Sequence, residues 1–531
     1  MASSYLSTKN YREQGKLVSL ADRFVNGGKD MLLSKSWTPL VVIARTTIIS
    51  MMERIERGQL RVITKEDGIF TFGTPAIFND EHPNPNKQQE PNPARDEIRA
   101  EITVLNDAFW VRMLLLADLG FSEAYMNGDI EVDDLDALFK VSSNPHLSHF
   151  CFSIANCNLI ENPQLFIINR SSLNELSTGF AGKIFSTFNA IVNSRFANSL
   201  SNAISNISAH YDISNRMFES FLSADMTYSC AIWGPKEGGV EGDLIHVGDR
   251  EFPPRDDVDE LEVAQMRKLR TVIARARISK GDRVLEIGSG WGSFAIEAVR
   301  TTGCTVDTLT LSIEQKQLAE ARIARAGLSE MITVHLLDYR ALPESFDNAF
   351  DRVVSIEMIE AVGREFLPTY FEVVNRVLRE DRGLAVVQVI TMPEARFEDY
   401  GKSVDFIQKH IFPGGFLPSV TCLVDSLLQG TKGKLVVEQI ENIGPHYART
   451  LREWRRRFEA TFEDEIVPAL HEAYPELKSR KGIDTFKRKW IYYFVYCETG
   501  FSMRALGDHI LTFTREVSLF ARSATRFSPP I

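Results

Sequence analysis

Val284-Leu285-Glu286-Ile287-Gly288-Ser289-Gly290-Trp291-Gly292 is the stretch of this chain that decides the fold. The apolar run 283–287 predicts a buried parallel strand, and the run 293–300 predicts a helix. Between them three glycines are spaced as G-x-G-x-G, and glycine lets the backbone turn tightly and approach a ligand closely. The N-terminus of the following helix offers free N–H groups. The stretch therefore predicts a strand, a turn and a helix that hold a nucleotide-like cofactor.

The glycine spacing argues against a dinucleotide cofactor. The third glycine falls too early for the G-x-G-x-x-G pattern of nicotinamide and flavin sites. Such sites also place an acidic residue at a strand tip about 20 residues further on. Asp307 has nearly this spacing but lies inside the strand-like run 304–311, whose tip is nearer Thr310 and Ser312. The pattern E-x-G-x-G-x-G instead resembles motif I of S-adenosylmethionine (SAM) methyltransferases, although such a turn can also be purely structural.

Composition describes a globular chain of two or three domains. The 531 residues are 44% hydrophobic and 25% charged, which are ordinary globular values. The formal net charge of −11 disfavours general electrostatic binding of nucleic acid. Six scattered cysteines form no metal-ligand spacing, so we expect a reducing compartment and no metal site.

The N-terminal residues predict neither a signal peptide nor a membrane span. They lack a basic segment followed by an apolar one. The apolar run 37–52 contains Pro39 and Arg45 and is too short to cross a bilayer. We therefore expect a cytoplasmic protein, peripheral to a membrane at most.

Helices and strand-like runs alternate from about 260 to 440, which predicts an α/β fold with a doubly wound, mostly parallel sheet. The expected strands are 284–287, 305–309, 332–336, 352–356, 384–390 and 435–440. Residues 395–430 form an insertion, and the tail 446–531 is expected to be helical. We divide the chain into an N-terminal α+β domain (1–150) that binds lipid or a partner, a helical connector (151–205) and a catalytic domain (206–531). Residues 79–98 predict an exposed loop.

Nine further segments in order resemble the cyclopropane-fatty-acyl-phospholipid synthase family, which includes mycolic acid cyclopropane synthase-like methyltransferases. One of them is Ser355-Ile356-Glu357-Met358-Ile359-Glu360-Ala361-Val362-Gly363. The others are 206–215, 225–231, 310–315, 338–340, 411–419, 446–451, 490–494 and 497–501. The resemblance covers about 200–515, reaches weakly into 100–140 and leaves 1–98 uncovered. It implies a class I, Rossmann-like SAM methyltransferase domain.

The resemblance also implies transfer of the SAM methyl group to a cis double bond of a phospholipid acyl chain, with closure of a cyclopropane ring. An alkene is a poor nucleophile, so the sulfonium methyl must be held in line with it. A base must then remove a proton from the new methyl group, and water must stay away from the cation. One alternative keeps SAM but ends in C-methylation of an unsaturated lipid, a sphingoid base or a specialised metabolite. Another is a catalytically inactive lipid-binding protein, against which the intact site residues argue.

As the base, the resemblance implies a bound bicarbonate ion. It would rest on Cys230, Glu360, Tyr447 and the backbone amide of Ile390. Gln388 stands where the family usually has histidine, and glutamine can donate a hydrogen bond but cannot become cationic.

Each of these residues also has a plain structural interpretation. The cysteine could be a small buried hydrophobe, and the tyrosine could serve packing alone. Glu360 could pair with Arg364, while Glu357 is expected to be a structural residue on the same helix.

The resemblance further implies eight SAM-binding residues. They are Tyr228 and Ser229 on the lid side, Gly288 and Gly290 for the methionine part, Thr310 and Gln315 for the ribose, and Asp338 and Tyr339 near the adenine. The expected partners are an unsaturated phospholipid or other lipid, a membrane surface and a second copy in a homodimer, but no nucleic acid. The basic groups 452–457 and 487–489 are either solvated helix faces or contacts to lipid phosphates.

Overall fold

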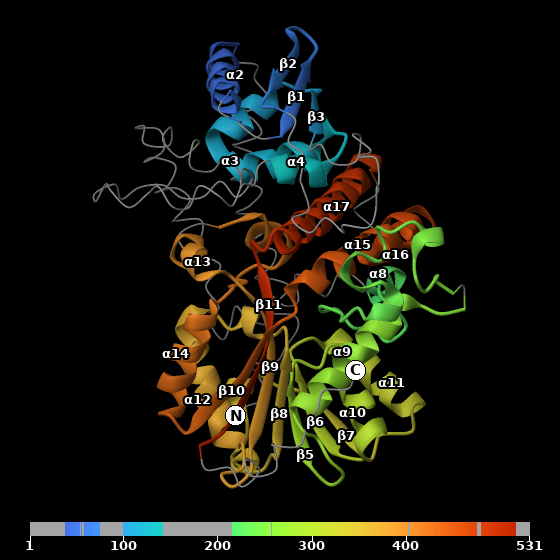
Figure 1. The fold of residues 1–531 in the computed structure, drawn as a ribbon, viewed down its shortest axis with the longest axis vertical. Coiled ribbons are helices and arrows are strands. Elements are labelled where there is room, and N and C mark those ends of the chain that lie inside the picture. The colour runs from blue at the N-terminus through green and yellow to red at the C-terminus, as the bar shows by residue number, and fades with distance from the viewer. Residues whose placement is uncertain are drawn as a thin grey trace, which may run out of the picture. The chain divides into compact units, whose positions relative to one another are not determined.

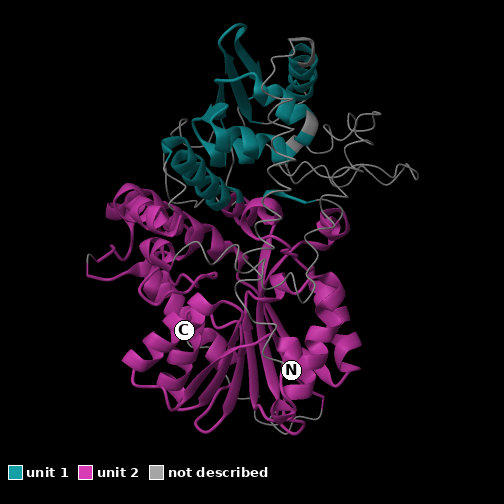
Figure 2. Cartoon of the chain, turned by 180° about the vertical axis from the view of Figure 1, so that it is seen from behind, with its two compact units in different colours: residues 1–195, 403–406, 479–496 teal, residues 196–402, 407–478, 497–531 magenta. Residues whose placement is uncertain are grey.

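The computed structural model describes residues 38–74 except 54, 56 and 57, residues 99–141, and residues 215–516 except 256, 402–403 and 475–478 (Figure 1). Two compact units divide the chain (Figure 2). Unit 1 comprises 1–195, 403–406 and 479–496, and unit 2 comprises 196–402, 407–478 and 497–531. The expected loop 79–98 and connector 151–205 lie outside the described residues.

Unit 2 is built on a seven-stranded sheet with the order β10-β11-β9-β8-β5-β6-β7. The strands are β5 (Arg283–Ile287), β6 (Thr305–Thr310), β7 (Ile332–Leu336), β8 (Arg352–Ile356), β9 (Leu384–Thr391), β10 (Leu435–Asn442) and β11 (Gly507–Arg515). Strands β7, β6, β5, β8 and β9 pair in parallel, and only β11 runs against its two neighbours. The predicted α/β fold with a mostly parallel sheet is therefore confirmed, and all six expected strands are present.

Helices cover both faces of this sheet, which is why its central strands β5, β8 and β9 are buried along almost their whole length. In Figure 1, α9 (Glu260–Arg275), α10 (Ser293–Thr302) and α11 (Ile313–Arg325) lie on one side, and α12 (Leu367–Val377) and α14 (Val420–Thr431) lie on the other. A strand buried on both faces reads as a continuous hydrophobic run, as Leu384 to Val387 does. The chain winds from β5 to β7 in one direction and then places β8 on the other side of β5. Ligands of such sheets bind at this switch point, beyond the carboxyl ends of the strands.

The prediction of an entirely helical tail is wrong at one place. The tail contains α15 (Gly444–Thr461), α16 (Val467–Ala473) and α17 (Arg480–Ser502), but residues 507–515 form strand β11 between β9 and β10. Seven of its nine residues are buried, so the strand lacks the alternation of polar and apolar residues that marks a half-exposed strand. Its register places Asp508 opposite Ile390 and Ile510 opposite Gln388.

Unit 1 holds a four-stranded sheet with the order β2-β1-β3-β4. Its elements are α2 (Thr38–Met52), β1 (Gln59–Thr64), β2 (Gly68–Phe72), β3 (Arg99–Val104), α3 (Ala108–Asn127), β4 (Ile130–Val132) and α4 (Leu135–Val141). Most of α17 belongs to this unit, because Tyr492 packs against the rings of Tyr125 and Phe139. The catalytic domain expected at 206–531 therefore does not coincide with unit 2.

The remaining helices are short. They are α8 (Asn215–Phe221), α13 (Glu394–Tyr400), the π-helices 407–411 and 462–466, and several 3-10 helices of three residues each, among them 359–361. Within the described ranges, no helix has both the length and the apolar composition of a membrane span.

The antiparallel strand offers a matched test of the core. Leu511 is 0% exposed and lies opposite Ile440 of β10, which is 40% exposed. We expect Leu511→Ala to lower the free energy of unfolding by about 2–5 kcal/mol, because it removes packed methyl groups and leaves a cavity. Ile440→Ala should lower the free energy of unfolding by clearly less, because the side chain of Ile440 is already partly exposed. Urea unfolding of both variants measures the difference, and equal losses would contradict the placement of β11 in the core.

Candidate functional site

The glycine-rich turn follows β5 directly and opens toward a cavity. Gly288, Gly290 and Gly292 have φ angles of 100°, 47° and 86°, in the left-handed region that glycine adopts readily. A Cβ added to Gly288 would lie 3.1 Å from Cβ of Met358. A Cβ added to Gly290 would meet nothing within 4 Å, so this backbone faces open space. The turn therefore leaves room for a ligand against the backbone.

The cavity lies at the carboxyl ends of the central strands. All eight residues predicted to bind SAM line it, namely Tyr228, Ser229, Gly288, Gly290, Thr310, Gln315, Asp338 and Tyr339. The structure thus gathers them in one place, although their separate contacts to SAM remain predictions. The five predicted catalytic residues are not among the described residues that line this cavity.

Polar groups at the cavity fit a nucleoside ligand. Thr310 Oγ1 donates to Gln315 Oε1 at 2.8 Å, and Asp338 accepts from the guanidinium of Arg340 at 2.7 and 2.9 Å. Two further atoms, Tyr339 Oη and Glu286 Oε2, are buried without a hydrogen-bond partner in the described part of the chain. Burial raises the pKa of Tyr339 to about 12 and that of Glu286 to about 8, so both groups hold their protons near neutral pH. Unsatisfied buried groups of this kind indicate a missing polar partner.

Glu357, which lines the cavity, is a residue on which hydrogen bonds converge. Its Oε1 accepts from the backbone N–H of Cys230 at 2.7 Å and from Nε2 of Gln388 at 2.8 Å. Its Oε2 accepts from the hydroxyl of Tyr447 at 2.7 Å. The expectation that Glu357 lies on a helix is wrong, because it directly follows β8 and lines the cavity.

The backbone at Glu357 is also unusual. Its φ angle is 48°, which costs energy for any residue other than glycine and is most often found at functional sites.

The groups predicted to bind bicarbonate are already engaged. Gln388 and Tyr447 donate to Glu357, and the amide of Ile390 donates to Oε1 of Glu360 at 2.6 Å. The thiol of Cys230 faces the carbonyl oxygens of Ala231 at 3.3 Å and Ile443 at 3.7 Å. The donor set suits an anion, but the anion that it holds is a carboxylate of the chain itself. As arranged here, these residues do not fit a bicarbonate ion.

Two residues that the sequence did not suggest complete the cluster. Gln388 Nε2 donates to Oδ2 of Asp508 at 2.8 Å as well as to Glu357. Lys268 of α9 is completely buried and donates to the hydroxyl of Ser229. Desolvation lowers the pKa of Lys268, whereas burial and the charge of Glu357 raise the pKa of Asp508 well above its usual range. Asp508 lies in the strand that was predicted to be helix, and Lys268 lies in an ordinary amphipathic helix, so neither carried a local signal.

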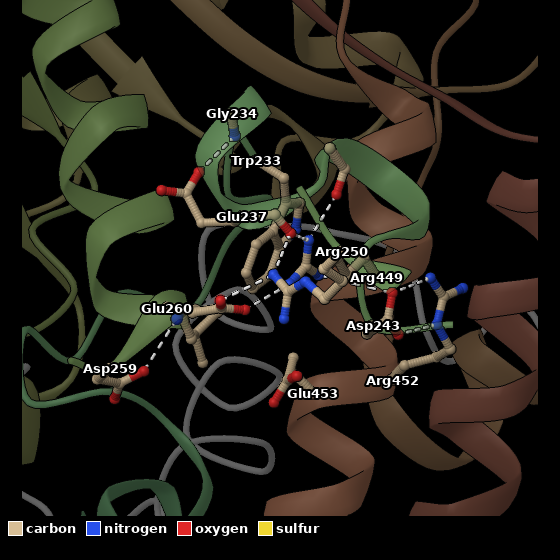
Figure 3. A network of polar contacts seen from close by, with 12 residues as sticks. Trp233, Gly234, Glu237, Asp243, Arg250, Asp259, Glu260, Arg449, Arg452 and Glu453 are labelled. Atoms are coloured by element: carbon tan, nitrogen blue, oxygen red, sulfur yellow. Dashed lines mark hydrogen bonds and ion pairs between the residues drawn. The ribbon is translucent and has the colours of Figure 1, made fainter. Parts of the chain in front are cut away.

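A network of arginines holds the segment around Cys230 against α15 (Figure 3). The guanidinium of Arg449, which is 0% exposed, lies 3.9 Å from the ring centroid of Trp233. It donates to the carbonyl oxygens of Glu237 and Gly239 and, at 2.8 Å, to the carboxylate of Glu260. This network fixes the segment and the helix that supply two of the three donors to Glu357.

A second set of contacts extends the network. Arg452 of α15 pairs with Asp243 at 2.9 Å, and Arg250 pairs with Glu260 at 2.8 Å (Figure 3).

Comparison with known proteins gives one family. The family model of mycolic acid cyclopropane synthetase matches residues 198–509. Tuberculostearic acid methyltransferase UfaA1 of Mycobacterium tuberculosis is 37% identical over 317 residues. The match covers 59% of this chain and 65% of the relative, so this chain spans slightly less than two thirds of the relative's length. Cyclopropane-fatty-acyl-phospholipid synthase of Escherichia coli is 30% identical over 421 residues, 79% of this chain and 88% of the relative. The solved structure of the cyclopropane synthase MmaA2 from Mycobacterium tuberculosis is 24% identical in sequence and has a TM-score of 0.46. The match covers 59% of this chain and 98% of MmaA2.

The glycine turn predicts a loss of ligand binding on substitution. Gly290→Val places a branched side chain where the backbone faces the cavity, and we expect the affinity for SAM to fall at least about tenfold, or about 1.4 kcal/mol. Gly327→Val is the matched control, because Gly327 also has a positive φ of 70° and open space around its Cβ position but does not line the cavity. Titration calorimetry on both folded variants measures the effect. Unchanged affinity in Gly290→Val would contradict the assignment of the cavity to SAM.

The arginine network predicts a local loss of stability. Arg449→Met removes one donor each from Glu260 and from the carbonyl oxygens of Glu237 and Gly239, and Arg250 remains a donor only to the first two. We expect a cost of about 3–5 kcal/mol, because a buried charged group loses its partner. Hydrogen exchange should accelerate in residues 233–243. Arg456→Met on the same helix is the control, because the side chain of Arg456 is 67% exposed and its loss should change stability by no more than about 0.5 kcal/mol. Equal exchange in both variants would show that the network does not hold the segment.

Proposed function

The chain belongs to the mycolic acid cyclopropane synthetase family, and from this membership we propose that it adds a methylene group from SAM to a cis double bond of an unsaturated phospholipid acyl chain, forming a cyclopropane ring. The chain is a SAM-dependent methyltransferase. The observation that best supports the proposal is the position of the Glu357 carboxylate, which three donors hold at a cavity that the glycine-rich turn also lines. Cyclopropanation needs an anionic base at such a place.

The residues around the cavity are suited to holding two reactants in a dry site. When bound, SAM supplies a sulfonium methyl group that an alkene can attack. The glycine turn and the residues at the ends of β6 and β7 would fix the orientation of SAM, and fixed orientation can contribute much of the rate. Tyr228 packs against Trp454 with ring centroids 4.9 Å apart, and Tyr447 stacks on Phe501 at 4.5 Å. Aromatic rings exclude water and their faces favour a passing cation.

The proton acceptor is the point at which this chain departs from the mechanism implied by the resemblance. Bicarbonate needs free donors, whereas the described donors are all engaged by Glu357, Glu360 or backbone carbonyl groups. This arrangement leaves no free donor for that ion among the described groups, and we propose that the base is a group of the protein.

A second product has its own support. The relative with 37% identity is named for tuberculostearic acid, and its name describes a methyltransferase rather than a cyclopropane synthase. C-methylation of an acyl chain begins with the same attack of the double bond on the methyl group. Loss of a proton from that methyl group closes the ring directly. If a hydride first moves from the methylated carbon to the neighbouring cationic carbon, the same proton loss gives a methylene branch. The geometry of the base serves both outcomes.

We also propose that the enzyme meets its lipid substrate at a membrane surface. The homodimer remains a prediction.

Lipid mass spectrometry tests the proposal. Cells that express the chain should gain one CH2 unit on monounsaturated phospholipid chains, with loss of the olefin. Cells that express Gly290→Val are the control and should show little or none of this product. A product that gains CH2 but retains a double bond would favour the methylene-branched alternative. If no lipid changes although the purified protein binds SAM, the proposed substrate class is wrong.

A further inference from the structure

We infer that Glu357 is the general base of the reaction and occupies the place at which the resemblance implies a bicarbonate ion, with Asp508 as a residue that positions it. This inference rests on the proposed function. Glu357 was expected to be a structural residue, and Asp508 lies on β11, a strand that was expected to be helix.

The hydrogen bonds around Glu357 form a complete anion site. The donors come from three separate places: the amide of Cys230, the side chain of Gln388 on β9 and the hydroxyl of Tyr447 on α15. All three are neutral groups at 2.7–2.8 Å from the carboxylate. A carboxylate accepts several hydrogen bonds and donates none, so this donor set matches the ionised form. Because Glu357 is part of the chain, no ion has to be captured from solution.

The position of Glu357 suits proton abstraction. It follows β8, the strand beside the glycine-rich strand β5, and it lines the cavity. Glu360, the predicted catalytic carboxylate, is not among the described residues that line the cavity. Its Oε1 is taken by the amide of Ile390, and its Oε2 is buried without a described partner. Desolvation and the charge of Glu357 raise the pKa of Glu360 to about 8, so it is mostly protonated at neutral pH.

The charged and titratable groups around Glu357 explain how one negative charge is kept there. Lys268 on α9, the thiol of Cys230, the hydroxyl of Tyr447, Glu360 and Asp508 on β11 act on it or on its immediate partners. Glu357 and Asp508 accept hydrogen bonds from the same nitrogen of Gln388, so their carboxyl groups are neighbours.

Two neighbouring carboxyl groups in a desolvated site share protons rather than ionise together. Burial and the charge of Glu357 raise the pKa of Asp508 well above its usual range, and desolvation raises the pKa of Glu357 as well. We therefore assign the proton to Asp508, which is completely buried, and the charge to Glu357, which has three donors and faces the cavity.

The chemical step balances with these groups alone. The π electrons of the double bond form a bond to the methyl carbon, and the electron pair of the broken sulfur–carbon bond stays on sulfur, leaving S-adenosylhomocysteine (SAH). The acyl chain then carries one positive charge. Glu357 accepts a proton from the new methyl group, and the electron pair of that C–H bond closes the ring. The carboxyl group returns its proton to solvent after product release.

The charge on Glu357 gives a readout that needs no lipid. SAM carries a sulfonium charge that SAH lacks, so an ionised Glu357 favours SAM over SAH. Protons compete with this cation, and the preference for SAM should therefore rise as the pH rises through the titration of the Glu357–Asp508 pair. We expect Glu357→Gln to reduce the preference about tenfold, which is a moderate share of the attraction between opposite charges at short range. Asp508→Asn replaces a protonated carboxyl group by a neutral amide and should largely keep the preference.

Titration calorimetry with SAM and with SAH, over a range of pH, measures these effects. If Glu357→Gln keeps the preference for SAM, the assignment of the charge to Glu357 is overturned. Loss of the preference in Asp508→Asn instead would place the charge on Asp508. Because this measurement uses no lipid, it remains decisive even if the lipid assay fails, and the two failures are thereby distinguished.

Chemical rescue tests the role in catalysis. Glu357→Gly suits the positive φ angle, removes the carboxylate and leaves its three donors facing an empty space. We expect the parent enzyme to be indifferent to bicarbonate in degassed buffer. The Glu357→Gly variant should be at least about a hundredfold slower, in line with the usual contribution of a general base, and should recover with added bicarbonate. Tyr447→Phe in the same variant should weaken the rescue. A parent rate that depends on bicarbonate, or full activity in Glu357→Gln, would overturn the inference.

Discussion

A desolvated carboxylate must be held by hydrogen bonds, and in unit 2 this requirement joins parts of the chain that are far apart in sequence. Glu357 follows β8, Gln388 lies on β9, Tyr447 on α15, and Cys230 lies in the segment before α9. An anion taken from water is costly unless such donors compensate it. The sheet brings Glu357 and Gln388 together directly, because β8 and β9 pair in parallel with Ile356 opposite Gln388. The other two donors depend on side-chain contacts outside the sheet.

Those outer contacts are supplied by charge pairing rather than by hydrophobic packing alone. Arg449 lies two residues beyond Tyr447. Its contacts reach Trp233 and Glu237 on the segment that also carries Cys230, and Glu260 at the start of α9 (Figure 3). A buried arginine that satisfies several acceptors is costly to disturb, since removing it leaves those acceptors unpaired. The network therefore fixes the geometry of the donors at the carboxylate, although none of its charges lies on the cavity.

The parts of the fold that could be predicted are those with a local signal. Six strands, the glycine turn and the helix after it follow from apolar runs and glycine spacing in adjacent residues. Strand β11 could not be predicted in this way, because its polar start, Asp508-His509, and its burial on both faces hide the strand pattern. The eight predicted SAM residues gather at one cavity because motifs at successive strand ends meet at one edge of a parallel sheet. Glu357, Lys268 and Asp508 were missed because their importance lies in contacts between distant segments, and no short motif records such contacts.

Gln388 and Glu357 are best understood together. The resemblance implies histidine at the position of Gln388, and a histidine could become cationic when it faces an anion. A cation beside Glu357 would stabilise the ionised carboxylate and make it a weaker base. Glutamine donates the same hydrogen bond without a charge, and its single Nε2 bridges Glu357 and Asp508. With glutamine, the basicity of Glu357 is set by desolvation, by its neutral donors and by the charge of Lys268 on α9. A site that holds its own carboxylate thus gains from losing the histidine, whereas a site that must attract an anion from solution would gain from keeping it.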